Sequence, residues 1–121
     1  MKKTILVADD ERAITDLVAF ALEMEGYSVI QAFDGPEALK LAETEDPDLI
    51  LLDIMMPGID GREVSRRLKE NKTTSHIPIL LISAAPNPDI ASAKADGFVS
   101  KPFDIDRLME RVRDLVEKRE G

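Results

Sequence analysis

Five side chains that could take part in phosphate chemistry stand at the ends of short apolar runs: Asp9, Asp10, Asp53, Ser83 and Lys101. Three carboxylates held close together repel one another and would partly protonate unless a cation joined them. Mg²⁺ suits such a set, because it prefers one or two carboxylates together with waters and phosphate oxygens. The lysine adds a point charge that fits a phosphoryl oxygen.

These residues predict a site for a phosphoryl group beside a metal ion, provided that the fold brings them together. The alternative is a set of ordinary loop acids that pair with Lys101 in a salt bridge. Their placement depends on the elements that precede them, so the order of those elements decides between the two interpretations.

The chain alternates between strand-like and helix-like patterns from one end to the other. Short apolar runs predict strands at residues 4–8, 27–32, 49–52, 79–82 and 98–99. Helical spacing of apolar residues predicts helices at 11–25, from Gly35-Pro36 onward, at 62–71, at 90–94 and from Asp104 onward. Strands that are apolar on both faces and alternate with helices predict an α/β fold with a parallel sheet covered on both sides.

A single domain spanning residues 1–121 fits this pattern, since the length allows one core and shows neither a linker nor a repeat. Ligands of open α/β sheets bind outside the carboxyl ends of the strands. The acids, the serine hydroxyl and the lysine all follow such ends, so we expect them at one edge of the sheet.

Composition excludes several functions. The chain has no cysteine, which rules out disulfides, thiol catalysis and thiolate metal sites. A net charge of −8 argues against direct binding of nucleic acid, because that usually needs a basic face. Met1-Lys2-Lys3 leads at once into the first predicted strand, which leaves no signal peptide or membrane span there. We therefore expect a cytoplasmic protein.

Four stretches together resemble the receiver domain of bacterial response regulators in two-component signalling. They are ILVADDE (5–11), LILLDIMMPGIDG (49–61), ILLISA (79–84) and ADGFVSKPF (95–103), and the match covers nearly the whole chain in order. The resemblance implies a doubly wound, five-stranded parallel sheet of order 2-1-3-4-5 in a flavodoxin-like three-layer sandwich.

The resemblance also implies a role for each site residue. Asp53 would be the phosphoacceptor, and its donor a histidine kinase or a histidine phosphotransfer protein. Asp10, Asp53 and the backbone carbonyl of Met55 would bind Mg²⁺ directly, and Asp9 through a water. Ser83 and Lys101 would bind the phosphoryl group.

Two further features follow from the same resemblance. Phe98 would be the switch aromatic that follows the movement of Ser83, and the Lys101–Pro102 peptide bond would be cis.

The side chains of Met55 and Ala85 would help to set how fast water removes the phosphoryl group. Because neither can orient a water strongly, we expect slow autodephosphorylation. We expect no enzymatic activity beyond this reaction and the self-catalysed transfer of a phosphoryl group to Asp53.

Two other functions compete with a phosphorylation switch. A degenerate receiver could serve as a scaffold, but its key positions would not all carry competent residues as they do here. An aspartyl-nucleophile phosphatase would need an acid two residues after Asp53, where this chain has Met55. Residues 117–121 directly follow the last predicted helix, which leaves no room for an output domain. If the chain is complete, we expect its output to be a protein contact or a phosphate relay.

The stretch between Ser83 and Lys101 is about one helical turn shorter than in typical receivers. Pro86 and Pro88 disfavour helix at the residues before them, so the fourth helix should be short. We hypothesise that residues 84–96 form a mobile segment that becomes ordered on phosphorylation.

Overall fold

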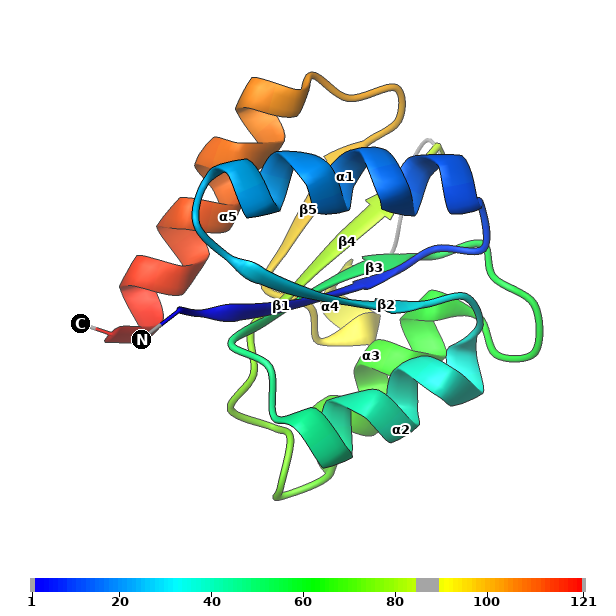
Figure 1. Cartoon of the computed structure of the whole chain (residues 1–121). Coiled ribbons are helices and arrows are strands. Elements are labelled where there is room, and N and C mark those ends of the chain that lie inside the picture. The colour runs from blue at the N-terminus through cyan, green and yellow to red at the C-terminus, as the bar shows by residue number, and fades with distance from the viewer. Residues whose placement is uncertain (1, 85–89, 121) are drawn as a thin grey trace.

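A computed structural model describes residues 2–84 and 90–120 of the chain, with side chains through residue 117 (Figure 1). Its strands are β1 (Thr4–Ala8), β2 (Ser28–Ala32), β3 (Leu49–Asp53), β4 (Ile79–Ser83) and β5 (Gly97–Ser100). Its helices are α1 (Arg12–Met24), α2 (Gly35–Glu45), α3 (Gly61–Glu70), α4 (Ile90–Ala93) and α5 (Ile105–Glu120). Every predicted element is present, with small differences at the ends.

The strands form one parallel sheet of order β2-β1-β3-β4-β5, which confirms the doubly wound α/β fold. Figure 1 shows α1 and α5 on one face of the sheet and α2, α3 and α4 on the other. The core is accordingly divided in two: Leu6, Ile50 and Leu81 pack toward α2 and α3, whereas Val7, Leu51 and Leu80 pack toward α1 and α5. Successive strand residues point to opposite faces, so a strand that is covered on both sides must be apolar throughout.

The central strands end on polar residues that belong to the strands themselves. The predicted strands stopped at residues 52 and 82, but Asp53 and Ser83 are the last residues of β3 and β4. Asp53 pairs in register with Ile82, and Ser83 pairs with Ser100. The sheet therefore holds the backbones of both residues through its hydrogen bonds.

The shortened fourth helix is a single turn, Ile90–Ala93, packed against α3. The buried Ser65 Oγ donates to the Ala93 carbonyl oxygen at 2.7 Å, and Arg66 Nε donates to the Ser92 carbonyl oxygen at 3.2 Å. Asp96 joins the sheet, because its N–H donates to the Ile79 carbonyl oxygen and its Oδ2 accepts from the Ile79 N–H.

A helix of one turn is not stable on its own. These tertiary hydrogen bonds stabilise it in place of the intrahelical bonds that a longer helix would have. The hypothesis of a mobile segment stays a prediction that hydrogen exchange must test against these contacts, and residues 85–89 lie outside the described part of the chain.

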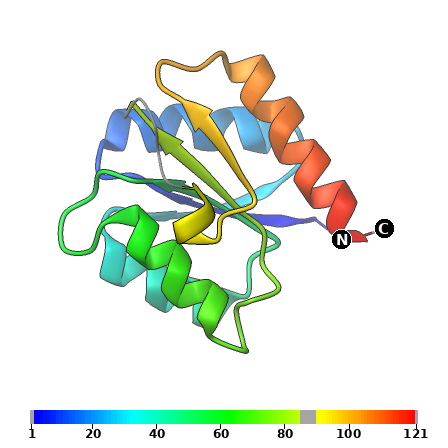
Figure 2. The same ribbon diagram turned by 180° about the vertical axis from the view of Figure 1, so that it is seen from behind.

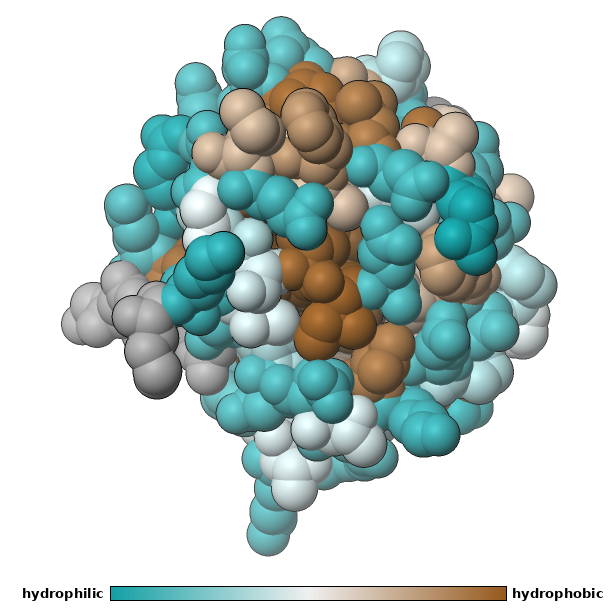
Figure 3. Space-filling view, viewed as in Figure 1, coloured by the Kyte–Doolittle hydropathy of each residue, from teal (hydrophilic) through white to brown (hydrophobic). Residues whose placement is uncertain are grey.

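One face of the molecule carries exposed apolar side chains. Leu17, Phe20 and Met24 of α1 are exposed although they follow helical spacing. In Figure 3, brown and tan side chains gather at the top of the view, where α1 and the start of α5 lie, and a second brown area lies at the centre. None of the described helices is both long and apolar enough to cross a bilayer.

Candidate functional site

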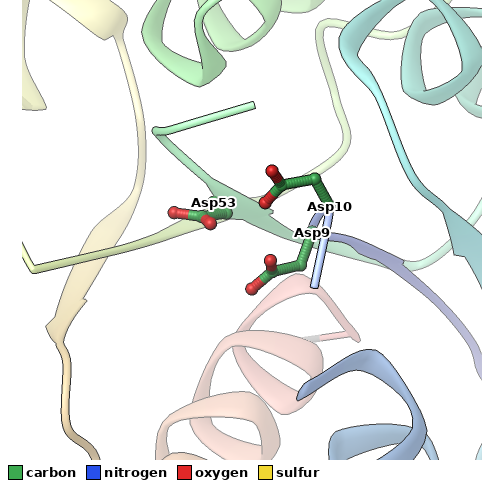
Figure 4. A group of neighbouring side chains, drawn as sticks. All are labelled: Asp9, Asp10 and Asp53. Atoms are coloured by element: carbon green, nitrogen blue, oxygen red, sulfur yellow. The ribbon is translucent and has the colours of Figure 1, made fainter. Parts of the chain in front are cut away.

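Three aspartates meet at the carboxyl edge of the sheet. Asp9 and Asp10 follow β1, and Asp53 ends the neighbouring strand β3. One carboxylate oxygen of each lies within 4.8 Å of the others, and the three side chains border a common space in Figure 4. Asp9 and Asp53 are buried, whereas Asp10 is exposed to solvent.

Lys101 provides the positive charge nearest to these acids. Its Nζ donates to Asp9 Oδ2 and to Asp53 Oδ2, each at 3.1 Å, and lies 3.6 Å from Glu11 Oε1. Burial favours the neutral amine, but the hydrogen bonds to the two aspartates outweigh that effect and raise the pKa of Lys101. The lysine is thus held in its charged form between the two buried carboxylates.

The remaining oxygens of the buried acids accept backbone bonds. Asp53 Oδ1 accepts from the Met55 N–H at 3.2 Å, and Asp9 Oδ1 accepts from the Glu11 N–H at 2.9 Å. These bonds orient both carboxylates, because each oxygen has a fixed donor. The structure thus leaves Asp10 as the most accessible carboxylate of the three.

Ser83 ends β4, and Lys101 directly follows the neighbouring strand β5, on the other side of β3 from β1. The Lys101 N–H donates to the Ser83 carbonyl oxygen at 2.9 Å, and Ser83 is fully buried. The peptide bond between Lys101 and Pro102 is cis. Phe98, in β5, is half-buried and packs against the part of the core that faces α2 and α3.

Burial raises the pKa of Asp53 to about 6, and the negative charge of Asp9 adds to this rise. The hydrogen bond and charge of Lys101 act in the opposite direction without cancelling it. Three acids facing one lysine therefore leave the pocket short of positive charge. A divalent cation bound among the carboxylates would remove that shortage.

We predict from this pKa that Asp53→Asn is more stable than the unaltered chain at pH 8 in the presence of a chelator. A carboxyl whose folded pKa lies above its unfolded value of 3.8 costs stability once it ionises, so stability falls between about pH 4 and pH 6 and stays low above that. Asparagine cannot ionise, so the advantage of the variant should grow between these two pH values and then stay constant. Urea unfolding at pH 3.5 and pH 8 measures the difference, which should be absent at the lower pH. A less stable variant at pH 8 would mean that the bond to Lys101 outweighs burial.

Two other residues contribute contacts to the site. Glu11 was considered only as the start of a helix, yet its carboxylate approaches Lys101; the run of three acids at 9–11 was the available indication. The other contact is made by Gly61, where a Cβ would lie 2.1 Å from the Asp53 carbonyl oxygen. The N-terminus of α3 thus packs directly on the strand end that carries Asp53.

Comparisons with known proteins agree with this geometry. The model of the response regulator receiver domain family matches residues 5–113. The transcriptional regulator RpaA of Synechocystis sp., described as DNA-binding, is 42% identical over 118 residues, which are 94% of this chain and 49% of RpaA. The response regulator PleD of Caulobacter vibrioides is 45% identical over 121 residues, which are 96% of this chain and 26% of PleD. The chain thus spans half or less of the length of these relatives.

Solved structures show the same fold along the whole chain. A CheY-like response regulator receiver domain protein from Methanospirillum hungatei aligns with a TM-score of 0.93 at 27% identity, covering 99% of this chain and 98% of that one. The receiver domain of the Francisella response regulator 1452 aligns with a TM-score of 0.89 at 33% identity, covering 97% and 98%. The chain belongs to the response regulator receiver domain family of two-component systems.

Proposed function

We propose that this chain is a phosphorylation-dependent switch in which Asp53 accepts a phosphoryl group from a phosphohistidine of a histidine kinase or phosphotransfer protein. The position of Asp53 supports this best. It ends the central strand β3, with the acids of β1 on one side and Ser83 and Lys101 on the other. Asp53 is thus the member of the acidic cluster whose strand lies between the strand that leads to the other two acids and the strand that ends in Ser83.

The transfer step requires the protein mainly to position the reacting groups and to neutralise the charge of the phosphoryl group. A carboxylate oxygen of Asp53 attacks phosphorus, and the bond between phosphorus and the donor's imidazole nitrogen breaks. The imidazole leaves with the electron pair of that bond and takes up a proton. Lys101 then exchanges Asp53 Oδ2 for a phosphoryl oxygen, and the Ser83 hydroxyl donates to another.

The donor set of the pocket fits Mg²⁺. Asp10, Asp53 and the backbone carbonyl of Met55 would hold the ion directly, and Asp9 through a water, as the resemblance to receiver domains implies. When bound, Mg²⁺ neutralises charge between the carboxylates and an incoming phosphoryl group. The raised pKa of Asp53 supports this assignment, because burial and the charge of Asp9 disfavour its ionised form and Lys101 does not offset them.

The response to phosphorylation passes through β4 and β5. Ser83 moves toward the phosphoryl group, and Phe98 follows into the space that it vacates. A ligand biases such an equilibrium only through contacts that differ between the two states. The exchange of partners by Lys101 and Ser83 supplies that difference, and the four-residue α4 stays bound to α3 through the carbonyl oxygens of Ser92 and Ala93.

Incubation with acetyl phosphate and Mg²⁺, followed by intact mass measurement, tests the proposal. The chain should gain one phosphoryl group, and an excess of chelator should prevent the gain. The adduct should be lost in mild base, as expected of an acyl phosphate. A chain that stays unlabelled under these conditions, although folded by circular dichroism, would contradict the proposal.

We predict that Met55→Asn shortens the lifetime of the phosphoryl group severalfold from minutes or longer. Met55 is largely exposed and follows Asp53 at the rim of the pocket, where its apolar side chain covers the approach of water. An amide there can orient a water molecule for attack. Loss of the phosphoryl mass after removal of acetyl phosphate measures the lifetime.

Met24→Asn is the matched control, because Met24 is equally exposed at the far end of α1. Its lifetime should equal that of the unaltered chain. Equal lifetimes for all three proteins would show that Met55 does not shield the phosphoryl group.

A further inference from the structure

The turn between β2 and α2, residues 33–37, lies against both of the loops that would supply Mg²⁺ ligands, although none of its residues belongs to the acidic cluster. Residues 9–11 follow β1 and carry Asp10, and residues 54–60 follow β3 and carry the Met55 carbonyl. β2 is the edge strand next to β1. Figure 2 shows the loop after β3 at the left of the view, at the same end of the sheet as the start of α2.

Two contacts join this turn to the loop after β1. The Asp9 N–H donates to the carbonyl oxygen of Ala32, the last residue of β2, at 3.1 Å. The guanidinium carbon of Arg12, the first residue of α1, lies 4.4 Å from the centroid of the Phe33 ring. Asp10 is therefore flanked in the chain by two residues that are held at the end of β2, one by a backbone bond and one by a cation–π contact.

Two glycines join the turn to the loop after β3. Gly35 is buried, and a Cβ there would lie 2.7 Å from the Ile59 carbonyl oxygen and 3.2 Å from the Ile59 nitrogen. Gly58, in the loop, has φ +86°, and a Cβ on it would lie 3.1 Å from Pro36 Cδ. The Gly35 N–H also donates to the Pro57 carbonyl oxygen, at 3.5 Å. The backbone of the turn thus packs directly on the backbone of the loop.

Hydrogen bonds within the turn hold its two contact points together. Asp34 Oδ1 accepts the Glu37 N–H, and Glu37 Oε1 accepts the Phe33 N–H, each at 2.8 Å. These reciprocal bonds are of the capping-box type, which fixes the entry of the chain into a helix. Pro36 restricts the backbone further, because its ring fixes φ. The turn therefore holds Phe33 and Gly35 in a constant relation to one another.

The loop after β3 has few other supports. Its first residue, Ile54, is anchored, because its carbonyl oxygen accepts the Gly61 N–H at 2.8 Å. Within the part of the chain that the structure describes, residues 55–59 receive one backbone–backbone bond from another element, the bond from Gly35. The position of the Met55 carbonyl thus depends on the strand end on one side and on α2 on the other.

We propose that Phe33 and Gly35 are positioning residues of the Mg²⁺ site, which set its affinity by holding the loops of Asp10 and Met55 at the separation that the ion requires. Mg²⁺ demands near-ideal octahedral geometry, so a small displacement of one ligand weakens its binding. Residues that orient metal ligands from outside typically contribute about tenfold to a hundredfold to the affinity. The role of the turn rests on the proposed function, because the metal site is part of it.

Gly35→Ala should raise the dissociation constant for Mg²⁺ at least about tenfold, as measured by isothermal titration calorimetry on the whole unphosphorylated chain. The added methyl group must push the loop that carries Met55 away from α2, because it meets backbone atoms that no side-chain rotation can move. Labelling by acetyl phosphate at saturating Mg²⁺ should return to within about twofold of the normal rate, since Asp53 itself is not displaced.

Gly26→Ala is the matched control. Its φ of +96° strains alanine, but no atom lies within 4 Å of the added Cβ, so the dissociation constant for Mg²⁺ should be unchanged. A loss of affinity that came from lower stability alone would affect both variants.

Phe33→Leu tests the other contact of the turn, because it removes the ring that lies under Arg12. Its dissociation constant for Mg²⁺ should rise severalfold. Phe33→Tyr keeps the aromatic face and should bind Mg²⁺ as the unaltered chain does. Phe20→Leu changes an exposed phenylalanine of α1 in the same way and should also bind normally.

Different results would refute the metal site and the role of the turn. If the unaltered chain takes up no Mg²⁺ in the titration, the metal site itself is wrong. If the unaltered chain binds Mg²⁺ and Gly35→Ala, folded by circular dichroism, binds it equally well, the turn does not position the site. Phe33→Tyr with as large a loss as Phe33→Leu would likewise contradict the role of the aromatic face. If Gly35→Ala does not fold, the two variants of Phe33 decide the matter.

Discussion

Asp53→Ala is expected to gain no phosphoryl group under conditions in which the unaltered chain gains one. The structure favours Asp53 over its two neighbours for a positional reason. Asp9 and Asp10 follow β1, whereas Ser83 ends β4 on the other side of β3. The Lys101 ammonium bonds both Asp9 and Asp53 and so reaches either strand. A phosphoryl group on Asp53 would lie between the acids that follow β1 and the Ser83 hydroxyl on β4. One on Asp10 would lie farther from that hydroxyl.

Intact mass measurement after incubation with acetyl phosphate and Mg²⁺ gives the result directly. Asp114→Ala is the control, since Asp114 is an exposed aspartate of α5 outside the acidic pocket, and this variant should be labelled fully. Labelling of Asp53→Ala at the normal level would remove Asp53 from the acceptor role. Fragment masses would then show whether Asp9 or Asp10 replaces it.

The strands and the edge that carries the site were predictable because their causes are local. Runs such as Leu49–Leu52 are apolar on both faces, which only a doubly covered sheet accommodates. In a parallel sheet all carboxyl ends lie at one edge, so the alternation of elements already brings Asp9, Asp53 and Lys101 together. The order of the strands came from the resemblance of motifs, since periodicity alone does not define neighbours.

The partners of particular side chains were not predictable, because they depend on distances between elements. Lys101 bridges Asp9 and Asp53 and also approaches Glu11, and no local pattern ranks these acids. The conformation of the segment after β4 likewise depends on tertiary hydrogen bonds. Proline positions indicated a short helix, but the bond from Ser65 to the Ala93 carbonyl oxygen shows how that helix is held. Local propensity describes an isolated segment, so it does not predict which tertiary bonds hold that segment in the folded chain.

Gly61→Ala is expected to slow labelling of Asp53 by about a hundredfold and to destabilise the fold by about 3 kcal/mol. A Cβ at this position would lie 2.1 Å from the Asp53 carbonyl oxygen and 2.8 Å from the Ile54 Cα. Both are backbone atoms, so no side-chain rotation relieves the overlap. The Gly61 N–H also donates to the Ile54 carbonyl oxygen at 2.8 Å, which ties α3 to the same strand end. Relief therefore requires the end of β3 and the start of α3 to separate, and that displaces the acceptor.

Gly26→Ala distinguishes loss of positioning from loss of stability. Gly26 has φ +96°, but no atom lies within 4 Å of the position that its Cβ would occupy, and it follows α1 at the end far from the pocket. Alanine there strains the backbone by about 1 kcal/mol without touching Asp53. Both variants should unfold at lower urea concentration, and labelling rates are compared at a temperature where each is folded. Gly26→Ala should label at the normal rate. If Gly61→Ala also labels at the normal rate, only α3 moves to make room for the added methyl group. The position of Asp53 then does not depend on the glycine.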